Sequence, residues 1–378
     1  MMSPLSLAKF LPSQVIKFDL LVIDEASQMR PEDSLGALLR AKKVVVVGDP
    51  NQLPPTDFFS RVTPADEGGT DNEDDADDID AESILDWSLK TFQAPRRLKW
   101  HYRSRCESLI AFSNHEFYSS NPGSHGDLIT FPNARPESFA IDLVQVKGSY
   151  RSSRNPSEVA QIVEAAIDFM IQHADLPEDR IPTLGIVAIN IQQRDAIREE
   201  FNRSGRDDAI ERYLSACNKG TSKRGPEPFF IKNLENVQGD ERDFIMISLT
   251  YGREAGQERV AQRFGPIART QGHRRLNVLF TRARERVILF SSMGSEDILV
   301  NATTKRGVRV LRDYLRYVES RRLEVGSATG RDFDSDFERD VRARLERVRG
   351  RPTGRCCGLS HRPGRSTSGP PDHLSCWD

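Results

Sequence analysis

The sequence predicts an α/β fold in which parallel sheets are divided between two domains. Short apolar runs without alternation occur at 20–23, 44–47 and 183–189, a pattern typical of strands that are covered on both faces. Stretches of helical periodicity lie between such runs, and 156–172 is the strongest of them. The length of 378 residues suits two domains with sizeable cores. Together these features indicate a parallel α/β architecture.

The composition narrows the class of protein. Five cysteines are too few and too scattered for a disulfide framework, so we expect a reducing, cytoplasmic compartment. There is no run of about 18 apolar residues and no secretory pattern at the N-terminus, so we expect no membrane partner. The formal net charge of −2 hides strong segregation, with acidic residues at 71–80 and many arginines at 273–286 and 339–365. The near-neutral total is therefore compatible with a basic groove for nucleic acid.

The first candidate catalytic and metal-binding residues lie in two neighbouring loops. The run 20–23 ends in Asp24 and Glu25, and ligands of parallel sheets bind beyond the carboxyl ends of the strands. One carboxylate can hold a magnesium ion through its water shell, while the other orients or deprotonates an attacking water. The next apolar run opens into the polar loop 48–55, and a helix predicted at 31–40 joins the two runs. Such a crossover places the loops side by side, although the two acids taken alone could equally be a solvated strand end.

The remaining elements follow from charge and periodicity. The loop 61–80 contains the acidic block 71–80, which we expect to be solvated and disordered rather than an interaction surface or a metal site. Further helices are predicted at 82–89, 107–117, 156–172, 195–201, 208–217 and 307–317. Further strands are predicted at 140–146, 183–189 and 287–290, and two more flank the polar insert 238–241.

An arginine-rich segment at 274–290 joins a predicted helix to a strand. Arg275 and Arg282 are seven residues apart, so we expect both on one face of that helix. A run of arginines on a helix is usually a solvated face, but apolar residues at helical spacing are embedded in this one. These are Leu276, Leu279, Phe280 and Ala283.

Five segments resemble the signature motifs of superfamily 1 DNA and RNA helicases. Asp24-Glu25-Ala26-Ser27-Gln28 resembles motif II, the Walker B site, and Gly48-Asp49-Pro50-Asn51-Gln52-Leu53-Pro54-Pro55 resembles motif III. Farther along, 98–110 resembles motif IV, 229–248 resembles motif V and 274–290 resembles motif VI. The segments occur in the family's order, and the resemblance covers roughly residues 1–293. Their spelling is closest to the branch of AAA-type helicases that contains the RNA-surveillance and Okazaki-fragment-processing enzymes.

The resemblance implies two RecA-like P-loop NTPase domains, an incomplete first one at 1–95 and a second one at 96–300, with ATP in the cleft between them. It implies a motor that hydrolyses ATP with Mg²⁺ and steps along single-stranded DNA or RNA. The first domain would supply Asp24 for the magnesium ion, Glu25 for the water and Gln52 to sense the γ-phosphate. The second would supply Arg103 for the γ-phosphate, Tyr102 beside the base, Gly239 for close backbone approach, Glu241 for the ribose hydroxyl and Arg282 as the cis arginine finger.

Several of these assignments have a structural alternative. Tyr102 could be a core residue and Arg103 part of a surface ion pair. The insert 238–241 could be the turn of a β-hairpin with surface charges. The family has a loop at this place that touches the bound strand or the base, so Gln192 and Gln193 either make that contact or only start the helix that follows them.

The phosphate-binding loop that this chemistry needs has no counterpart in the sequence. A helicase holds the phosphates with the pattern G-x-x-x-x-G-K-[S/T], which does not occur in these 378 residues. The family places that loop upstream of motif II, so the chain resembles an N-terminally truncated helicase whose missing half could be a separate chain. We expect this polypeptide alone to hydrolyse ATP weakly or not at all. The rival hypothesis is a non-catalytic nucleic-acid-binding or interaction module derived from a helicase.

The C-terminal region is predicted to add little structure. The segment 301–325 provides one helix, and 326–378 comprises a linker, a short helix at 334–345 and a disordered tail. The short helix resembles the opening of a nuclease-like domain that is truncated here. The stretch after Asp340 has neither a lysine nor paired acids, which argues against a nuclease site. The cysteines and histidines of the tail have spacings that fit no common zinc finger.

Overall fold

The computed structural model describes residues 2–11, 16–55, 82–92, 95–120, 126–130, 139–204, 207–220 and 224–323. The acidic loop 61–80 and the whole segment 326–378, with its predicted helix and its cysteines and histidines, lie outside the described residues. In the described part of the chain, no helix is long and apolar enough to cross a membrane.

The N-terminal part is built around a two-stranded parallel sheet. Its elements are α1 (Pro4–Phe10), β1 (Leu21–Ile23), α2 (Pro31–Leu38), β2 (Val44–Val46) and α3 (Ile84–Thr91). The strands pair in parallel register, with Leu21 opposite Val44 and Ile23 opposite Val46, so the predicted crossover is confirmed. Pro31 occupies the first turn of α2, where its missing N–H leaves no hydrogen bond unmade. Ser83 caps α3 by accepting from the N–H of Asp86 at 3.1 Å.

Only one face of this small sheet is covered by described residues. Ile23 packs with Ile84 and Leu85 of α3, whereas Val22 is 56% exposed and Val45 is 45% exposed. The prediction that 20–23 is buried on both faces is therefore wrong for the described chain. The physical reason is the pleat, which turns alternate residues outward on a sheet whose described helices pack against the other side.

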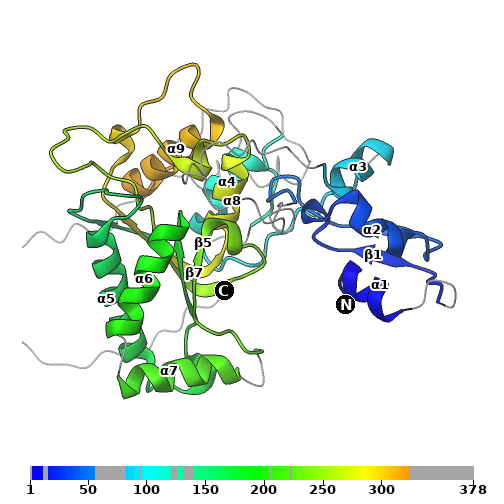
Figure 1. Ribbon diagram of the computed structural model, residues 1–378, viewed down its shortest axis with the longest axis horizontal. Helices are drawn as coiled ribbons and strands as arrows, with labels where there is room; N and C mark the ends of the chain where they lie inside the picture. Colours follow the sequence, from blue (N-terminus) through cyan, green and yellow to red (C-terminus); the bar gives the residue numbers. More distant parts are fainter. Residues whose placement is uncertain are drawn as a thin grey trace, which may run out of the picture. The chain divides into compact units, whose positions relative to one another are not determined.

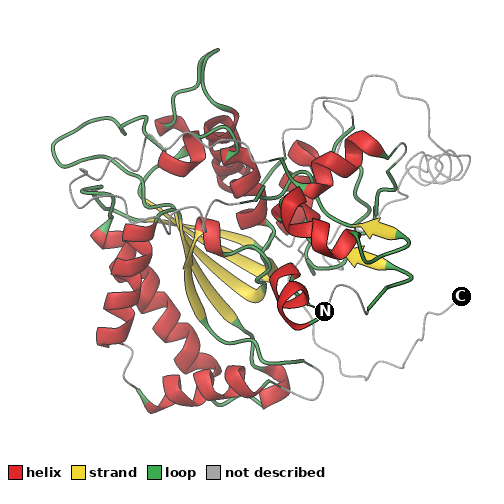
Figure 2. Ribbon diagram, turned by 45° about the vertical axis from the view of Figure 1, so that its right-hand side comes forward, coloured by secondary structure: helices red, strands yellow, loops and turns green. Residues whose placement is uncertain are grey.

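The second part is a five-stranded, all-parallel sheet with helices on both faces (Figure 2). The strands lie in the order β3 (Ile141–Gln145), β7 (Ala283–Ser291), β6 (Arg242–Ser248), β4 (Leu184–Ala188) and β5 (Phe230–Asn233). In Figure 1, α5 (Pro156–His173), α6 (Ile191–Ser204) and α7 (Asp208–Lys219) cover one face, and α4 (Ser108–Phe117), α8 (Gly272–Phe280) and α9 (Arg306–Ser320) cover the other. Every residue of β4 is buried, as its unbroken apolar run predicts.

A hydrophobic core lies on each face of this sheet. On the α5 face, Ile162 and Met170 pack against Ile186 of β4 and Met246 of β6. On the opposite face, α9 joins the same core as α4 and α8, and Phe280 stacks on Tyr314 with ring centroids 3.5 Å apart. The helix within 301–325 is therefore part of the second core.

Two details of the connections differ from the expected ones. The insert 238–241 is not a hairpin turn, because β5 and β6 lie on opposite sides of β4 and do not pair with each other. Helix α6 begins at Ile191, four residues earlier than predicted, because the Asn190 side chain accepts from the N–H of Gln193 at 2.7 Å.

Candidate functional site

Asp24 and Glu25 follow β1 at the carboxyl edge of the small sheet, and both are exposed to solvent. Glu25 has a left-handed backbone conformation, with φ 52° and ψ 40°, which is uncommon outside glycine and clusters at functional sites. Its N–H donates to Asp24 Oδ1 at 3.0 Å, and its Oε2 accepts from Gln28 Nε2 at 3.1 Å. A solvent-exposed pair of acids is thus held in one local geometry at the predicted ligand edge.

The loop that follows β2 runs beside these acids, as the crossover predicts. The Ala26 N–H donates to the Val47 carbonyl at 2.9 Å. A Cβ on Gly48 would lie 3.1 Å from the Ser27 nitrogen, so the close approach of the two loops explains the glycine.

Asp49 orders the loop that carries Gln52. Its Oδ1 accepts from the Asn51 N–H at 2.9 Å, and its Oδ2 accepts from Gln52 Nε2 at 3.1 Å and from the Tyr118 hydroxyl at 2.6 Å. The carbonyl end of Gln52 accepts from Gln238 Nε2 at 3.4 Å. Both ends of the Gln52 amide are therefore engaged, one by its own loop and one by the polar insert after β5.

Asn277 of α8 completes this set of contacts between the loop 48–55 and the second part. Its Nδ2 donates to the Asn51 carbonyl and to the Tyr118 oxygen, both at 3.0 Å. Asn51 Nδ2 donates to the Phe117 carbonyl at 2.8 Å. Burial raises the pKa of the Tyr118 phenol, and the Asp49 carboxylate raises it further, so the hydroxyl stays a donor. Sequence reasoning missed Tyr118 and Asn277, although a polar residue between Leu276 and Val278 was a possible signal.

Replacing Tyr118 with phenylalanine should therefore lower the free energy of unfolding by about 1–2 kcal/mol, because a hydrogen bond to a carboxylate is lost without a change of shape. Urea unfolding followed by circular dichroism measures the loss. Tyr150→Phe, which changes a ring that packs against Tyr251, is the matched control and should change stability by less than about 0.5 kcal/mol. Equal losses for the two variants would contradict the role given to the Tyr118 hydroxyl.

Arg103 and Glu241 meet at the amino edge of the larger sheet. Arg103 Nε donates to Glu241 Oε2 at 2.6 Å, and its Nη1 donates to the Thr281 carbonyl at 3.3 Å. The other oxygen of Glu241 lies 3.5 Å from Arg284 Nη1. Arg103 thus stands where motifs IV, V and VI converge, with one third of its side chain open to solvent.

Arg282 is the most buried of the candidate side chains, at 2% exposed. It does not share a helix face with Arg275, because α8 ends at Phe280 and Arg282 lies in the short link to β7, so that prediction is wrong. Its Nε donates to the Val278 carbonyl at 2.8 Å, and its Nη2 donates to Thr281 Oγ1 at 3.2 Å.

The electrostatic surroundings of Arg282 connect the two groups of candidate residues. Burial, together with the neighbouring charge of Arg103, lowers the pKa of Arg282 to about 10. The carboxylates of Glu25 and Glu241 act in the opposite direction. Arg282 is therefore within electrostatic range of an acid from β1 and of both partners at the amino edge of the larger sheet.

The other candidates take distinct positions. Tyr102 is 85% exposed, so the alternative of a core residue is wrong. Gly239 has φ +82°, a conformation that favours glycine, and nothing lies within 4 Å of a Cβ placed there. His101 contacts Ser104 Oγ at 2.9 Å, and burial together with Arg103 lowers its pKa to about 4. Gln193 is fully buried and therefore cannot touch a bound strand.

A buried ion network lies behind these residues and was missed in the sequence. Asp243 is 1% exposed and receives Arg284 Nε at 3.0 Å and Arg224 Nη1 at 2.6 Å. Burial alone would raise the pKa of Asp243, but the Thr183 N–H and the two guanidinium groups outweigh it and lower the pKa. Arg284 also binds Glu227, with Nη1 2.7 Å from Oε1. The network supports Arg284 and, through it, Glu241.

Comparison with known proteins identifies the class to which this fold and site belong. Residues 81–294 match the family model AAA_12, described as an AAA domain, and residues 5–60 match AAA_11, also described as an AAA domain. The chain belongs to the AAA-domain family of superfamily 1 helicases. The motif-based prediction of this family is therefore confirmed.

The comparisons also find two curated relatives and one solved structure. The chain is 30% identical to "Uncharacterized ATP-dependent helicase MG140" of Mycoplasma genitalium over 347 residues, which is 90% of this chain and 29% of that protein. It is 24% identical to "Helicase SEN1" of Saccharomyces cerevisiae over 71% of this chain and 11% of that protein. The solved structure titled "The structure of PRRSV helicase" aligns with 72% of this chain and 34% of that chain, at 12% identity and a TM-score of 0.31. The chain thus spans less than one third of the length of the two curated relatives.

Proposed function

We propose that this chain is the motor portion of an ATP-dependent helicase that acts on single-stranded nucleic acid. The observation that carries the proposal is the position of Arg282. It is buried beside Arg103 and Glu241 and within electrostatic range of Glu25, which belongs to the other sheet. A buried guanidinium without a carboxylate hydrogen-bonded to it, among the described residues, is suited to an anion such as a terminal phosphate.

The proposed roles follow from the chemistry of each group. Arg103 and Arg282 stabilise the charge that develops on the transferring phosphoryl group. Glu25 orients or deprotonates the attacking water, and Gln52 contacts the γ-phosphate from the ordered loop 48–55. Glu241 accepts from the ribose hydroxyl when it is not bound to Arg103.

Tyr102 and Gly239 complete the proposed nucleotide site. The exposed ring of Tyr102 is free to lie against the base. Gly239 has no side chain, so the nucleotide can closely approach the backbone of the insert after β5.

The surroundings of Asp24 fit a hydrated magnesium ion. One of its oxygens accepts the Glu25 N–H, and the other is left for a water of the metal's shell. No three histidine, cysteine or acidic residues gather as a metal-binding group within the described ranges, which suits an ion held mainly by water and phosphate. A bound Mg²⁺ would neutralise charge on the phosphates and align them for attack.

The chain should hydrolyse ATP feebly, because no G-x-x-x-x-G-K-[S/T] pattern is present to hold the phosphates. In a phosphate-release assay with single-stranded DNA, we expect turnover far below about 1 s⁻¹. That rate is the low end of the range for ordinary enzymes. A polypeptide that supplies this loop is a proposed partner, and the exposed apolar residues Val22 and Val45 offer it a packing surface. Many turnovers per second by the chain alone would contradict this expectation.

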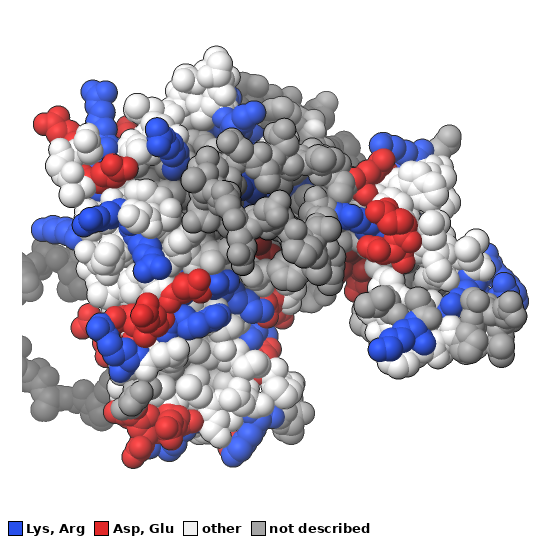
Figure 3. Space-filling model, in the orientation of Figure 1, with Lys and Arg blue, Asp and Glu red and all other residues white. Residues whose placement is uncertain are grey.

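Single-strand binding should survive without hydrolysis and should depend on salt. On the face drawn in Figure 3, Lys and Arg side chains alternate with Asp and Glu, so on that face we expect local contacts with a strand rather than a broad basic patch. If the protein contacts three or four phosphates of the strand, its affinity for the strand should fall about 20–50-fold between 50 and 200 mM salt. Fluorescence anisotropy with a labelled dT oligomer measures this slope, and binding that ignores salt would contradict phosphate contact.

The alternative function is a non-catalytic nucleic-acid-binding module derived from a helicase. Single-strand affinity that ADP, ATP analogues and Mg²⁺ leave unchanged would support this alternative over the motor.

A further inference from the structure

A fully buried carboxylate organises the carboxyl edge of the larger sheet, opposite the proposed nucleotide residues. Glu158 Oε2 accepts from the Ser248 hydroxyl at 2.6 Å and from the Thr250 N–H at 2.7 Å. Its Oε1 accepts from the Ser292 N–H at 2.9 Å and from Asn155 Nδ2 at 3.2 Å. This one side chain therefore joins the first turn of α5 to the ends of β6 and β7.

A second buried amide extends the same network. Gln193 Oε1 accepts from the Asn155 N–H at 2.8 Å, and Gln193 Nε2 donates to Ser248 Oγ at 3.0 Å. Glu158, Asn155, Gln193 and Ser248 are all fully buried. Burying these polar groups costs desolvation free energy, and their mutual hydrogen bonds offset that cost only while every member keeps one arrangement. The network therefore makes this edge of the sheet rigid.

The backbone held by Glu158 is strained. Thr250 has φ +69°, and a β-branched residue at positive φ is a genuine outlier. Its N–H is the group that Glu158 accepts at 2.7 Å. Strain of this kind persists only where the surroundings impose it, and it is concentrated at ligand-binding sites.

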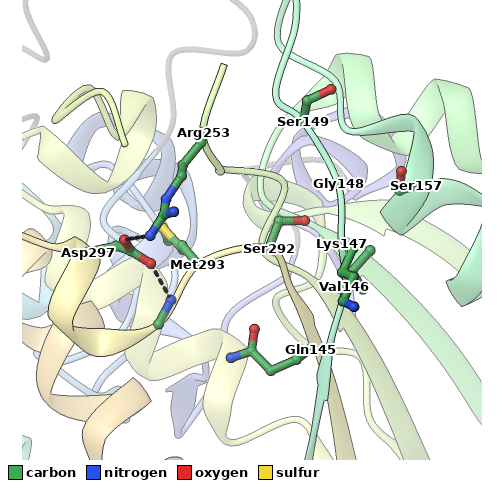
Figure 4. Close-up of a pocket in the computed structure, with 11 residues that line it drawn as sticks. Gln145, Val146, Lys147, Gly148, Ser149, Ser157, Arg253, Ser292, Met293 and Asp297 are labelled. Carbon is green, nitrogen blue, oxygen red and sulfur yellow. Dashed lines mark hydrogen bonds and ion pairs between the residues drawn. The ribbon is translucent and has the colours of Figure 1, made fainter. Parts of the chain in front are cut away.

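The segments that Glu158 joins line an open cavity of about 580 Å³ (Figure 4). Its polar lining includes Lys147, Ser149, Ser157, Arg253 and Ser292. Figure 4 shows Lys147, Ser149 and Ser157 on one side and Arg253 on the other, where Arg253 Nη2 is 2.9 Å from Asp297 Oδ1. No aromatic ring is among the lining residues, so the cavity suits a sugar–phosphate backbone better than a stacked base.

We propose that Glu158 is a positioning residue that shapes this cavity into a subsite for the phosphodiester backbone of a single strand. The inference rests on the proposed function, because it names where part of the strand binds. Glu158 does not touch the strand. It acts by holding the Ser292 and Thr250 backbones, which fix one wall of the cavity and the start of the segment that leads to Arg253.

The charge state of Glu158 makes this role measurable. Burial raises its pKa to about 7, although hydrogen bonds from Ser248, Thr250 and Ser292 partly oppose the rise. An ionised carboxylate only accepts, so it matches four donors, whereas the protonated acid carries a hydrogen that must displace one of them. The open, binding-competent arrangement therefore belongs to the ionised form, which dominates above about pH 7.

The groups facing Glu158 do not themselves titrate in this range. They are Asn155 of α5, Ser248 and Thr250 at the end of β6, Ser292 at the end of β7 and Gln193 of α6. α7 packs farther along α5, where Tyr213 meets Phe169. The charged residues of the adjoining cavity are Lys147, Arg253 and Asp297.

The test measures binding of a fluorescein-labelled dT oligomer to the full chain at pH 6, 7 and 8 and constant ionic strength. The wild type should bind up to about tenfold more tightly at pH 8 than at pH 6, because the competent fraction rises by that factor around a pKa of 7. Glu158→Gln should remove the pH dependence and bind as weakly as the wild type does at pH 6. Glu164→Gln, the same change on the exposed side of α5, should retain the wild-type profile.

Stability should move in the opposite direction, which separates positioning from simple loss of structure. The folded-state pKa of Glu158 lies above its unfolded value, so the folded chain binds the extra proton between about pH 4.5 and 7. This group therefore stabilises the fold at low pH, and that stability is lost as the pH rises through 7. Weak binding at pH 6 should accompany a urea midpoint that, measured relative to Glu158→Gln, is higher at pH 6 than at pH 8, because the variant shares every other titrating group, including His101, whose lowered pKa acts in the opposite direction.

Ser248→Ala serves as a second variant in case Glu158→Gln does not fold. It removes one donor to the charged form, so the midpoint of the binding profile should shift to higher pH. An unchanged midpoint in Ser248→Ala, or a pH profile retained by Glu158→Gln, would overturn the role of Glu158 alone. Absence of binding by the wild type at every pH would overturn the proposed function and this subsite with it.

Discussion

Replacing Arg284 with alanine should lower the free energy of unfolding by about 3–5 kcal/mol, because removal of one partner leaves a buried charge uncompensated. Arg284 Nε lies 3.0 Å from Asp243 Oδ1, and Asp243 is 1% exposed. The variant leaves Arg224 as a contact of Asp243, but it removes the guanidinium that also binds Glu227. Urea unfolding followed by circular dichroism gives the loss.

Arg286→Ala is the matched control for that experiment. It lies two residues along the same strand and pairs with Asp142 at 2.6 Å, but both side chains are exposed by more than a third. An exposed ion pair contributes about 0–1 kcal/mol, so the control should lose little. Similar losses for the two variants would show that burial of the Asp243 network does not matter to stability.

Replacing Arg282 with methionine should separate stability from function. The guanidinium is 2% exposed and its hydrogen-bond partners are the neutral oxygens of Val278 and Thr281. An apolar side chain of similar length removes the cost of burying the charge, so we expect the free energy of unfolding to rise by about 1–3 kcal/mol. With a polypeptide that supplies the phosphate-binding loop present, binding of ADP with aluminium fluoride and Mg²⁺ should fall at least about tenfold, because the charge that would meet the transferring group is gone.

Both readouts are needed to interpret the Arg282 variant. Urea unfolding reports the stability, and calorimetry with the transition-state analogue reports the binding. A variant that is destabilised and still binds the analogue normally would show that Arg282 is a structural cation. In a longer protein with full activity, hydrolysis itself should fall by about 10³-fold or more.

The local features of the fold were predictable because each has a local physical cause. The run 183–189 has no polar side chain after Thr183, and it forms β4, a fully buried strand in the interior of the sheet. The two apolar runs before Asp24 and Gly48 form neighbouring parallel strands, since a short helix between them allows only a crossover. The motif loops after these strands could therefore be placed side by side from sequence.

Strand order and helix ends depended on contacts that no local pattern records. β7 is the last strand in the chain, yet it lies between β3 and β6. The apolar spacing around Arg282 fits a helix through Ala283, but α8 stops at Phe280 because Ala283 already pairs with Arg242 of β6. Parallel strands are usually covered on both faces, and this rule gave the wrong prediction for Val22. The described chain covers only one face of the small sheet, and Val22 lies on the other.

The buried polar residues were the hardest part of the site to predict. Glu158 lies one turn before Ile162 on the buried stripe of α5, and this position indicated burial. An acid in the first turn of a helix, however, usually does no more than interact favourably with the helix dipole. Asp243 and Arg284 are far apart in sequence and meet only through β6 and β7. Their pairing follows from the sheet register rather than from spacing in the chain.

The most direct measurement of the central claim is a crystal structure of this chain, together with a polypeptide that supplies the phosphate-binding loop, in complex with ADP, Mg²⁺ and aluminium fluoride. The account predicts the fluoride group within about 3 Å of the guanidinium groups of both Arg103 and Arg282, with Glu25 across from them beside the attacking water. An analogue bound elsewhere, or one with both guanidinium groups facing away from it, would contradict the account.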